Sequence, residues 1–254
     1  MEPSSVKSLS GPALSLQEHA AIARAKRSNF YVIISVAALL IVLAGFSRTY
    51  VVPMASGTFA GRPLVHIHGA LYFCWIILFI VQPTLARTRN IKLHRKLGVA
   101  GFILAGAMLV IGISVAITGA RLNSPVLMVG GLQPKQFLLI PITDMILFAT
   151  FLALSLVNLK KPETHKRLMV LATVALLPAA FGRLLPMLGI GMPLVILLFQ
   201  ESIVLIAIAR ELIMKGKVHP VYLWGGSLML VVHFVRFPLA ATAWWTAIGD
   251  WLIQ

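Results

Sequence analysis

The sequence predicts an all-α integral membrane protein, a bundle of seven transmembrane helices. Hydrophobic residues make up 59% of the 254 residues and charged residues only 11%, and the mean hydropathy is +0.93. These values are typical of multi-pass membrane proteins and exceed what a soluble core of this size requires. Crossing a hydrocarbon layer takes about 20 apolar residues in a helix, and the chain contains seven runs of about that length.

The seven runs occupy residues 30–47, 64–86, 97–120, 137–159, 168–189, 193–214 and 221–247. We expect helices, because every backbone polar group in lipid must be satisfied within its segment and no run alternates as a barrel strand does. The third run carries small residues that allow a neighbouring helix to approach closely: Gly98, Gly101, Ala105, Gly112, Ala116 and Ala120.

A cytoplasmic tail, residues 1–28, is expected to precede a single membrane domain, residues 29–254. Within the tail, Ser15-Leu-Gln-Glu18 has the pattern of a capping box and predicts a short surface helix. The one cysteine, Cys74, lies in an apolar run. One cysteine builds neither a disulfide framework nor a CxxC motif, so redox chemistry would have to come from a cofactor.

The basic residues predict the orientation of the bundle in the membrane. The net charge is +15, and most of it lies in alternate loops. Sixteen Lys and Arg residues flank one set of helix ends, and only Arg48, Arg62, Arg121 and Lys135 flank the other. The positive-inside rule therefore predicts a cytoplasmic amino terminus and an outer carboxyl terminus. Topology accounts for the charge, so we expect membrane lipids and no nucleic acid as partners.

Four ionisable residues inside the predicted spans are the strongest functional indication. Asp144, Arg183, Glu201 and Arg236 would each cost about 2.5–3.5 kcal/mol near a helix centre. Counted along their helices, all four lie roughly 8–16 Å below the outer surface. They could form two ion pairs that only neutralise one another. Alternatively they could line a polar cavity, in which the arginines orient an anionic or carbonyl ligand and the acids carry protons or bind metal.

Three histidines are candidate metal or haem ligands. His66 and His68 follow Pro63 at the start of the second run, but residues two apart on a helix face different sides, which disfavours a chelate. A metal site could still combine His68 or His66 with Asp144 and Glu201. Haem would pair one of them with His233, although His233 is expected nearer mid-membrane. His233 could also be a hydrogen-bonded interior histidine, and it shares a face with Arg236.

A second, weaker metal site is conceivable at the cytoplasmic ends of the helices. His94, His165 and His219 each stand near the amino end of a predicted helix, where the helix dipole favours neutral imidazole. The alternative is that these histidines contact lipid headgroups in basic turns. No lysine follows Lys217 to form a retinal Schiff base, and HExxH, GxSxG and Walker patterns are absent from the sequence.

Short motifs give the chain a resemblance to uncharacterised bacterial multi-pass inner-membrane proteins. The motifs are His66-x-His68-Gly69, Leu93-His94-Arg95-x-Leu97-Gly98, His165-Lys166-Arg167-Leu168-Met169 and Gly216-x-Val218-His219-Pro220. The resemblance implies a bacterial inner-membrane location and assigns no role to the histidines. By analogy alone, the chain also resembles small haem-handling and oxidase-assembly membrane proteins.

Together these patterns predict a membrane protein with a buried polar and histidine site in the outer half of the bilayer. We expect dependence on a metal ion (Zn, Fe or Cu) or haem, and a lipophilic or anionic small molecule as substrate. An oxidoreductase or a metal-dependent hydrolase would suit that site. The alternative is a non-enzymatic transporter or an accessory subunit of a larger membrane complex. The partners we expect include further copies of the chain in a homo-oligomer, or the other subunits of such a complex.

Overall fold

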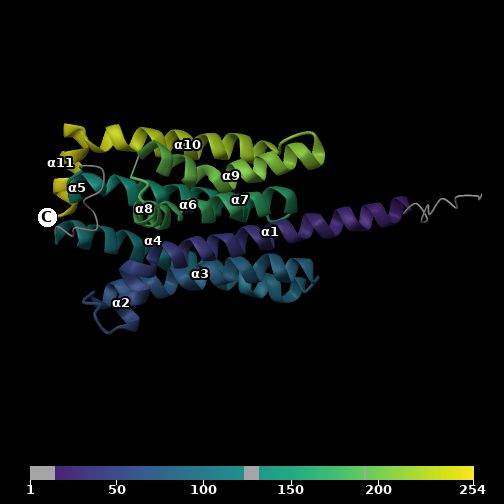
Figure 1. Cartoon of the computed structure of the whole chain (residues 1–254), viewed down its shortest axis with the longest axis horizontal. Coiled ribbons are helices and arrows are strands. Elements are labelled where there is room, and N and C mark those ends of the chain that lie inside the picture. The colour runs from purple at the N-terminus through teal and green to yellow at the C-terminus, as the bar shows by residue number, and fades with distance from the viewer. Residues whose placement is uncertain (1–14, 123–131, 192) are drawn as a thin grey trace, which may run out of the picture.

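The computed structural model describes residues 15–122, 132–191 and 193–254, without the side chains of residues 16–28, 193 and 194 (Figure 1). All regular elements in these ranges are helical. The all-α prediction is thereby confirmed for the described residues.

The first half of the chain forms three long helices. Helix α1 (Leu16–Phe46) continues through the π-helix η1 (Ser47–Val51) and the short α2 (Val52–Ala55). It is followed by α3 (Pro63–Arg87) and α4 (Ile91–Arg121). The predicted surface helix is thus the first part of α1, which begins at Leu16 and runs unbroken into the first apolar run. Residues 1–14 of the predicted tail lie outside the described residues.

The second half contains more and shorter helices. They are α5 (Pro134–Phe137), α6 (Leu139–Val157), α7 (Pro162–Val174), α8 (Pro178–Met187), α9 (Pro193–Lys215), α10 (Pro220–Ala240) and α11 (Ala243–Leu252). Five helical segments are long and apolar enough to cross a membrane, and six if the bent pair α7 and α8 is one span. Helix α9 is not among them, so the count of seven stays a prediction.

The long helices run side by side along one axis, and several of the turns that join them lie at one end of the bundle (Figure 1). At that end, α3 meets α4, α6 meets α7, and α9 meets α10. We call it the basic end, after Arg87, Arg95, Lys161, Lys166 and Lys217 in or beside these connections. The opposite end, where α5 and α11 lie, is called the far end.

Apolar side chains cover the outside of the bundle, and polar ones lie within it. Ile103, Phe234 and Val157 are 72%, 62% and 79% exposed. An exposed apolar surface of this extent is what a lipid-facing bundle presents. The small residues predicted to allow close packing are mostly buried in α4, which packs against α3 and α6. A Cβ at Gly112 would lie 2.2 Å from Tyr72 Oη, so any larger residue there would have to displace the tyrosine side chain.

Two predicted runs are broken in the structure. The run 168–189 bends by 48° between α7 and α8, because Pro178 has no N–H to donate and cannot continue α7. The carbonyl of Val174 instead accepts from the Leu177 N–H at 3.0 Å. The run 221–247 ends at Ala240, and the Thr242 hydroxyl accepts from the Trp245 N–H to begin α11.

Helix α11 is fastened to α5 at the far end. The Trp245 indole donates to the Gln136 carbonyl at 3.0 Å, and Lys135 pairs with Asp250 at 2.8 Å. Trp244 and Trp251 remain exposed. Exposed tryptophans at the end of a helical bundle are typical of the membrane interface.

Candidate functional site

Three helices bring five polar side chains together inside the bundle. Helix α6 supplies Asp144, α9 supplies Gln200 and Glu201, and α10 supplies His233 and Arg236. None is more than 6% exposed. We call this group the inner site. Asp144, Glu201 and Arg236 are three of the four in-span residues singled out from the sequence, and His233 joins them.

His233 lies between the two carboxylates. Its Nδ1–H donates to Glu201 Oε1 at 2.5 Å, and its Nε2 lies 3.6 Å from Asp144 Oδ1. The second distance is too long for a hydrogen bond, and Nε2 has no hydrogen-bond partner among the described residues. The imidazole therefore forms a hydrogen bond with Glu201 and only a longer electrostatic contact with Asp144.

Arg236 completes the inner site from the next turn of α10. Its Nη1 donates to Asp144 Oδ1 at 2.5 Å, and its Nη2 donates to Gln200 Oε1 at 3.4 Å. His233 and Arg236 are three residues apart and so share one face of α10, as their spacing predicted. Arg236 Nε has no partner within the described residues.

The charges of the inner site balance only with one added proton. The site contains two carboxylates and one guanidinium, which pairs with Asp144, and the remaining ionisable group is an imidazole. A buried net charge is strongly unfavourable. Neutrality therefore requires one proton shared among Glu201, His233 and Asp144. Such a site can bind, hold and release a proton.

The inner site is poorly arranged to bind metal through His233. The two nitrogens of an imidazole point in divergent directions, and each of them faces a carboxylate. Asp144 and Glu201 consequently lie at different edges of the ring and do not converge with it on one point. Among the described side chains, no group of three or more His, Cys, Asp or Glu residues is placed to hold a metal ion.

The other predicted outer residues lie apart from one another. His66 Nδ1 is 3.0 Å from Tyr50 Oη, whereas the His68 ring stacks on Tyr72 with centroids 4.1 Å apart. The His68 Nδ1 is buried without a partner among the described residues. Arg183 donates to the Ala179 carbonyl and lies over the Phe46 ring. It has no carboxylate partner in the described part of the chain, so the expected second ion pair uses His233 instead.

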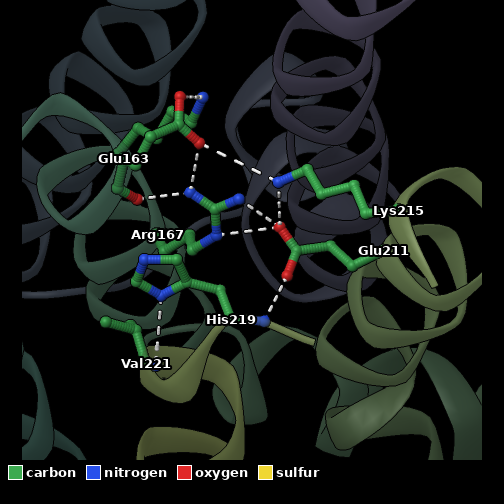
Figure 2. A network of polar contacts seen from close by, with 7 residues as sticks. Glu163, Arg167, Glu211, Lys215, His219 and Val221 are labelled. Carbon is green, nitrogen blue, oxygen red and sulfur yellow. Dashed lines mark hydrogen bonds and ion pairs between the residues drawn. The ribbon is translucent and has the colours of Figure 1, made fainter. Parts of the chain in front are cut away.

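A second polar group lies at the basic end, and sequence reasoning did not find it. Arg167 and Glu211 are each 1% exposed and form an ion pair between α7 and α9 (Figure 2). Lys215 Nζ lies 3.1 Å from Glu211 Oε1, and the His219 backbone N–H donates to Glu211 Oε2 at 2.7 Å. Arg167 also pairs with Glu163 at 2.8 Å. We call this group the basic-end network.

The basic-end network is visible in the sequence only as helical spacing. Glu163 with Arg167, and Glu211 with Lys215, are oppositely charged pairs four residues apart, a spacing that places them on one helix face. We expected Arg167 in a loop, just before a span beginning at 168. The helix instead begins at Pro162, which turns Arg167 into the bundle.

The three histidines of the predicted weaker site separate into two places. His94 and His165 line one cavity between α3, α4 and α7. His219 begins α10, where its Nδ1 accepts from the Val221 N–H at 3.3 Å. Burial lowers the pKa of His219 below its ordinary value, with a smaller effect of the Arg167 guanidinium.

Comparison with protein-family models, with curated proteins and with solved structures finds no match to this chain. The inner site and the basic-end network are therefore interpreted from their own chemistry.

Proposed function

We propose that this chain is a multi-pass membrane protein that binds and transfers protons at Glu201, His233 and Asp144. One observation carries the proposal: an imidazole lies between two buried carboxylates, of which only Asp144 is paired with a guanidinium. Ionisable groups placed deep in a bundle are typical of proton pathways in pumps and transporters. His is well suited to this role because its ordinary pKa lies near neutrality.

A proton-coupled transporter of a lipophilic or anionic small molecule is the function that this chemistry favours. A coupled transporter needs a group whose charge changes when it takes up a proton, and the inner site has one proton to give or take. The unpartnered Arg236 Nε offers a donor to an anionic substrate. By the positive-inside rule we place the basic end in the cytoplasm, and by resemblance we place the protein in a bacterial inner membrane.

Infrared spectroscopy of the purified protein in lipid tests proton binding directly. We expect a carboxyl band that changes with pH, and we expect Glu201→Gln to remove it. Glu163→Gln is the matched control, because Glu163 is 58% exposed and lies outside the inner site. If Glu201→Gln and Glu163→Gln leave the same band, the inner site does not titrate and the proposal is wrong.

Proton movement is tested in vesicles that contain a pH-sensitive dye. With an imposed membrane potential, we expect the reconstituted protein to change the internal pH, alone or on addition of a transported substrate. His233→Gln should abolish the change while leaving the protein folded. Proton movement that is unaffected by His233→Gln would contradict a pathway through the imidazole.

A metal- or haem-dependent oxidoreductase or hydrolase is the second candidate. The buried, unpartnered His68 Nδ1 favours it, because an imidazole nitrogen without a hydrogen bond can act as a ligand. Visible spectroscopy and elemental analysis of the purified protein test this function. A Soret band, or stoichiometric Zn, Fe or Cu that is lost in His68→Gln, would support it over proton transfer alone.

A further inference from the structure

A cavity of about 600 Å³ opens near the basic end, between α1, α3, α4 and α7. It is apart from the inner site: Asp144, Glu201, His233 and Arg236 are not among its lining residues. Its volume is that of a small-molecule binding site.

The lining changes from apolar to basic in the same direction on three helices. Along α3 it passes from Trp75 and Phe79 through Gln82 to Arg87. These 12 residues correspond to about 18 Å of helix. One end of the cavity is therefore suited to an apolar tail, and the other to a polar head.

On α4 and α7 the lining residues also change from apolar to basic toward the basic end. On α4, Arg95 lies in the first turn and Phe102 lies deeper in the bundle. On α7, Lys166 lies near the start and Val170 one turn further. The one acidic lining residue, Glu163, is already paired with Lys166 and Arg167. The head of a ligand in this cavity would thus meet a net positive surface.

Two imidazoles present a free nitrogen at the polar end of the cavity. His94 Nδ1 lies 3.3 Å from the Gln82 carbonyl, and His165 Nδ1 lies 3.2 Å from the Ser155 carbonyl. His165 Nδ1 also lies 2.8 Å from the Ser155 hydroxyl. Each Nδ1 thus has a partner within the protein, which leaves each Nε2 as the ring nitrogen available to a ligand. Neither Nε2 has a hydrogen-bond partner among the described residues.

Gln82 adds an unsatisfied acceptor at the polar end. Its Nε2 donates to the His94 carbonyl at 3.2 Å, which fixes the orientation of the amide. Its Oε1 is buried and has no partner in the described part of the chain. A buried acceptor without a donor is unfavourable. A hydroxyl on the ligand would satisfy Gln82 Oε1 by donating its one hydrogen there.

We infer that this cavity binds one anionic phospholipid whose headgroup carries a hydroxyl, with the phosphate toward Arg87, Arg95 and Lys166 and an acyl chain along Trp75 and Phe79. Basic pockets between transmembrane helices are suited to anionic headgroups. The apolar depth of the cavity distinguishes a lipid from free phosphate, and the buried Gln82 oxygen distinguishes a hydroxylated headgroup. The inference does not depend on the proton function proposed for the inner site.

Tryptophan quenching by lipids with brominated acyl chains tests the inference on the full chain in detergent. In the test protein, Trp224, Trp244, Trp245 and Trp251 are replaced by Phe, which leaves Trp75 as the reporter. We expect quenching by brominated phosphatidylglycerol, weaker quenching by phosphatidic acid and little by phosphatidylcholine. Native mass spectrometry of the unaltered chain gives the number of bound lipids, should the Trp-to-Phe protein fail to fold.

Matched variants separate the cavity from the general charge of the basic end. Arg95→Gln should weaken phosphatidylglycerol binding about fivefold, the effect of about 1 kcal/mol per basic residue at a lipid surface. Lys92→Gln and Lys96→Gln, on the same turns of α4 but outside the lining, should leave binding unchanged. Gln82→Leu should weaken phosphatidylglycerol more than phosphatidic acid.

Several outcomes would overturn the inference. Equal binding of phosphatidylcholine and phosphatidylglycerol would show that charge is not recognised. Equal effects of Arg95→Gln and Lys96→Gln would show that the cavity is not the site. Oleate that binds as tightly as phosphatidylglycerol would make the site one for fatty acids, and displacement of the lipid by inorganic phosphate alone would remove the role of the apolar tail.

Discussion

The inner site and the basic-end network use the same chemistry to opposite effect. Each places two carboxylates and an arginine between α9, α10 and one further helix. In the basic-end network, Arg167 and Lys215 neutralise Glu163 and Glu211 with no proton added (Figure 2). In the inner site, Arg236 pairs with Asp144, and the charge balance of Glu201 depends on the imidazole of His233.

The hydrogen bonds differ in the same way. Glu211 accepts the backbone N–H of His219, the last residue of the α9–α10 turn, and has two cationic partners as well. That turn is therefore tied to α7. In the inner site His233 Nε2 and Arg236 Nε are unpartnered among the described residues. A network whose hydrogen bonds are all made stabilises the fold, whereas an incomplete one has capacity left for a proton or ligand.

Removing Arg167 should give the largest loss of stability in this comparison. Arg167→Leu leaves Glu211 buried without its main partner, which typically costs about 3–5 kcal/mol. Thermal unfolding in detergent measures the loss, and Lys160→Leu is the control because Lys160 is exposed. The double variant Arg167→Met with Glu211→Gln should lose less than Arg167→Leu. A single variant that is as stable as the control would refute a structural role for the network.

Removing the imidazole of the inner site should affect proton binding more than stability. His233→Gln keeps a donor toward Glu201 but cannot carry the added proton. We expect loss of the pH-dependent carboxyl signal, with a destabilisation of about 1–3 kcal/mol. Infrared titration and thermal unfolding measure the two effects separately. A larger loss of stability than in Arg167→Leu would remove the distinction between the two groups.

A methyl group added at Gly112 should displace Tyr72 and so disturb the inner site, although neither residue belongs to that site. Tyr72 Oη lies 3.1 Å from the sulfur of Met145, the residue after Asp144. Gly112→Ala would push Tyr72 away, at a cost of about 1–3 kcal/mol. Gly106→Ala is the control on the same helix, since its Cβ would meet open space, and it should be neutral or slightly stabilising. Equal unfolding temperatures for the two variants would contradict the close packing of α3 and α4.

The smallest effect is expected from pH at His219. The folded pKa of this residue is lowered, so the unfolded chain takes up more protons and stability falls as acidity increases. We expect the contribution of His219 to be complete above about pH 6.5 and to be lost as the pH falls through the folded pKa. His219→Asn keeps a capping acceptor for the Val221 N–H and should reduce this dependence. An unchanged pH profile in His219→Asn would assign it to other groups.

The sequence predicts most of the fold because hydropathy reports membrane segments directly. The long runs appear as α1, α3, α4, α6, α9 and α10 with modest shifts at their ends. Two boundaries were missed, at Pro178 and at Thr242. One results from the missing N–H of a proline and the other from a hydroxyl that caps the next helix. A hydropathy average over many residues does not detect either.

The candidate site was predictable in part for a similar reason. Depth along a helix groups Asp144, Glu201 and Arg236 in one layer, and the structure places them together. The depth of a residue does not determine on which face of its helix the side chain lies. Depth therefore could not separate Arg183, which lies over the Phe46 ring, from the other three. Depth along the helix also predicted that His233 lies too deep to join them. That prediction was wrong because the His233 side chain, one turn from Arg236 on α10, reaches the layer.

The attachment of α11 to α5 holds the last helix at the far end, which allows a test of membrane topology with reporter proteins fused to the two ends of the chain. Helix α1 begins at the basic end, whereas α11 is held at the far end by Trp245 and Asp250 (Figure 1). A chain whose two ends emerge on opposite faces crosses an odd number of times. Reporters fused before Leu16 and after Gln254 should therefore give opposite compartment signals. The two fusions together therefore test whether the number of membrane crossings is odd or even, and the test does not depend on the hydropathy of any one helix.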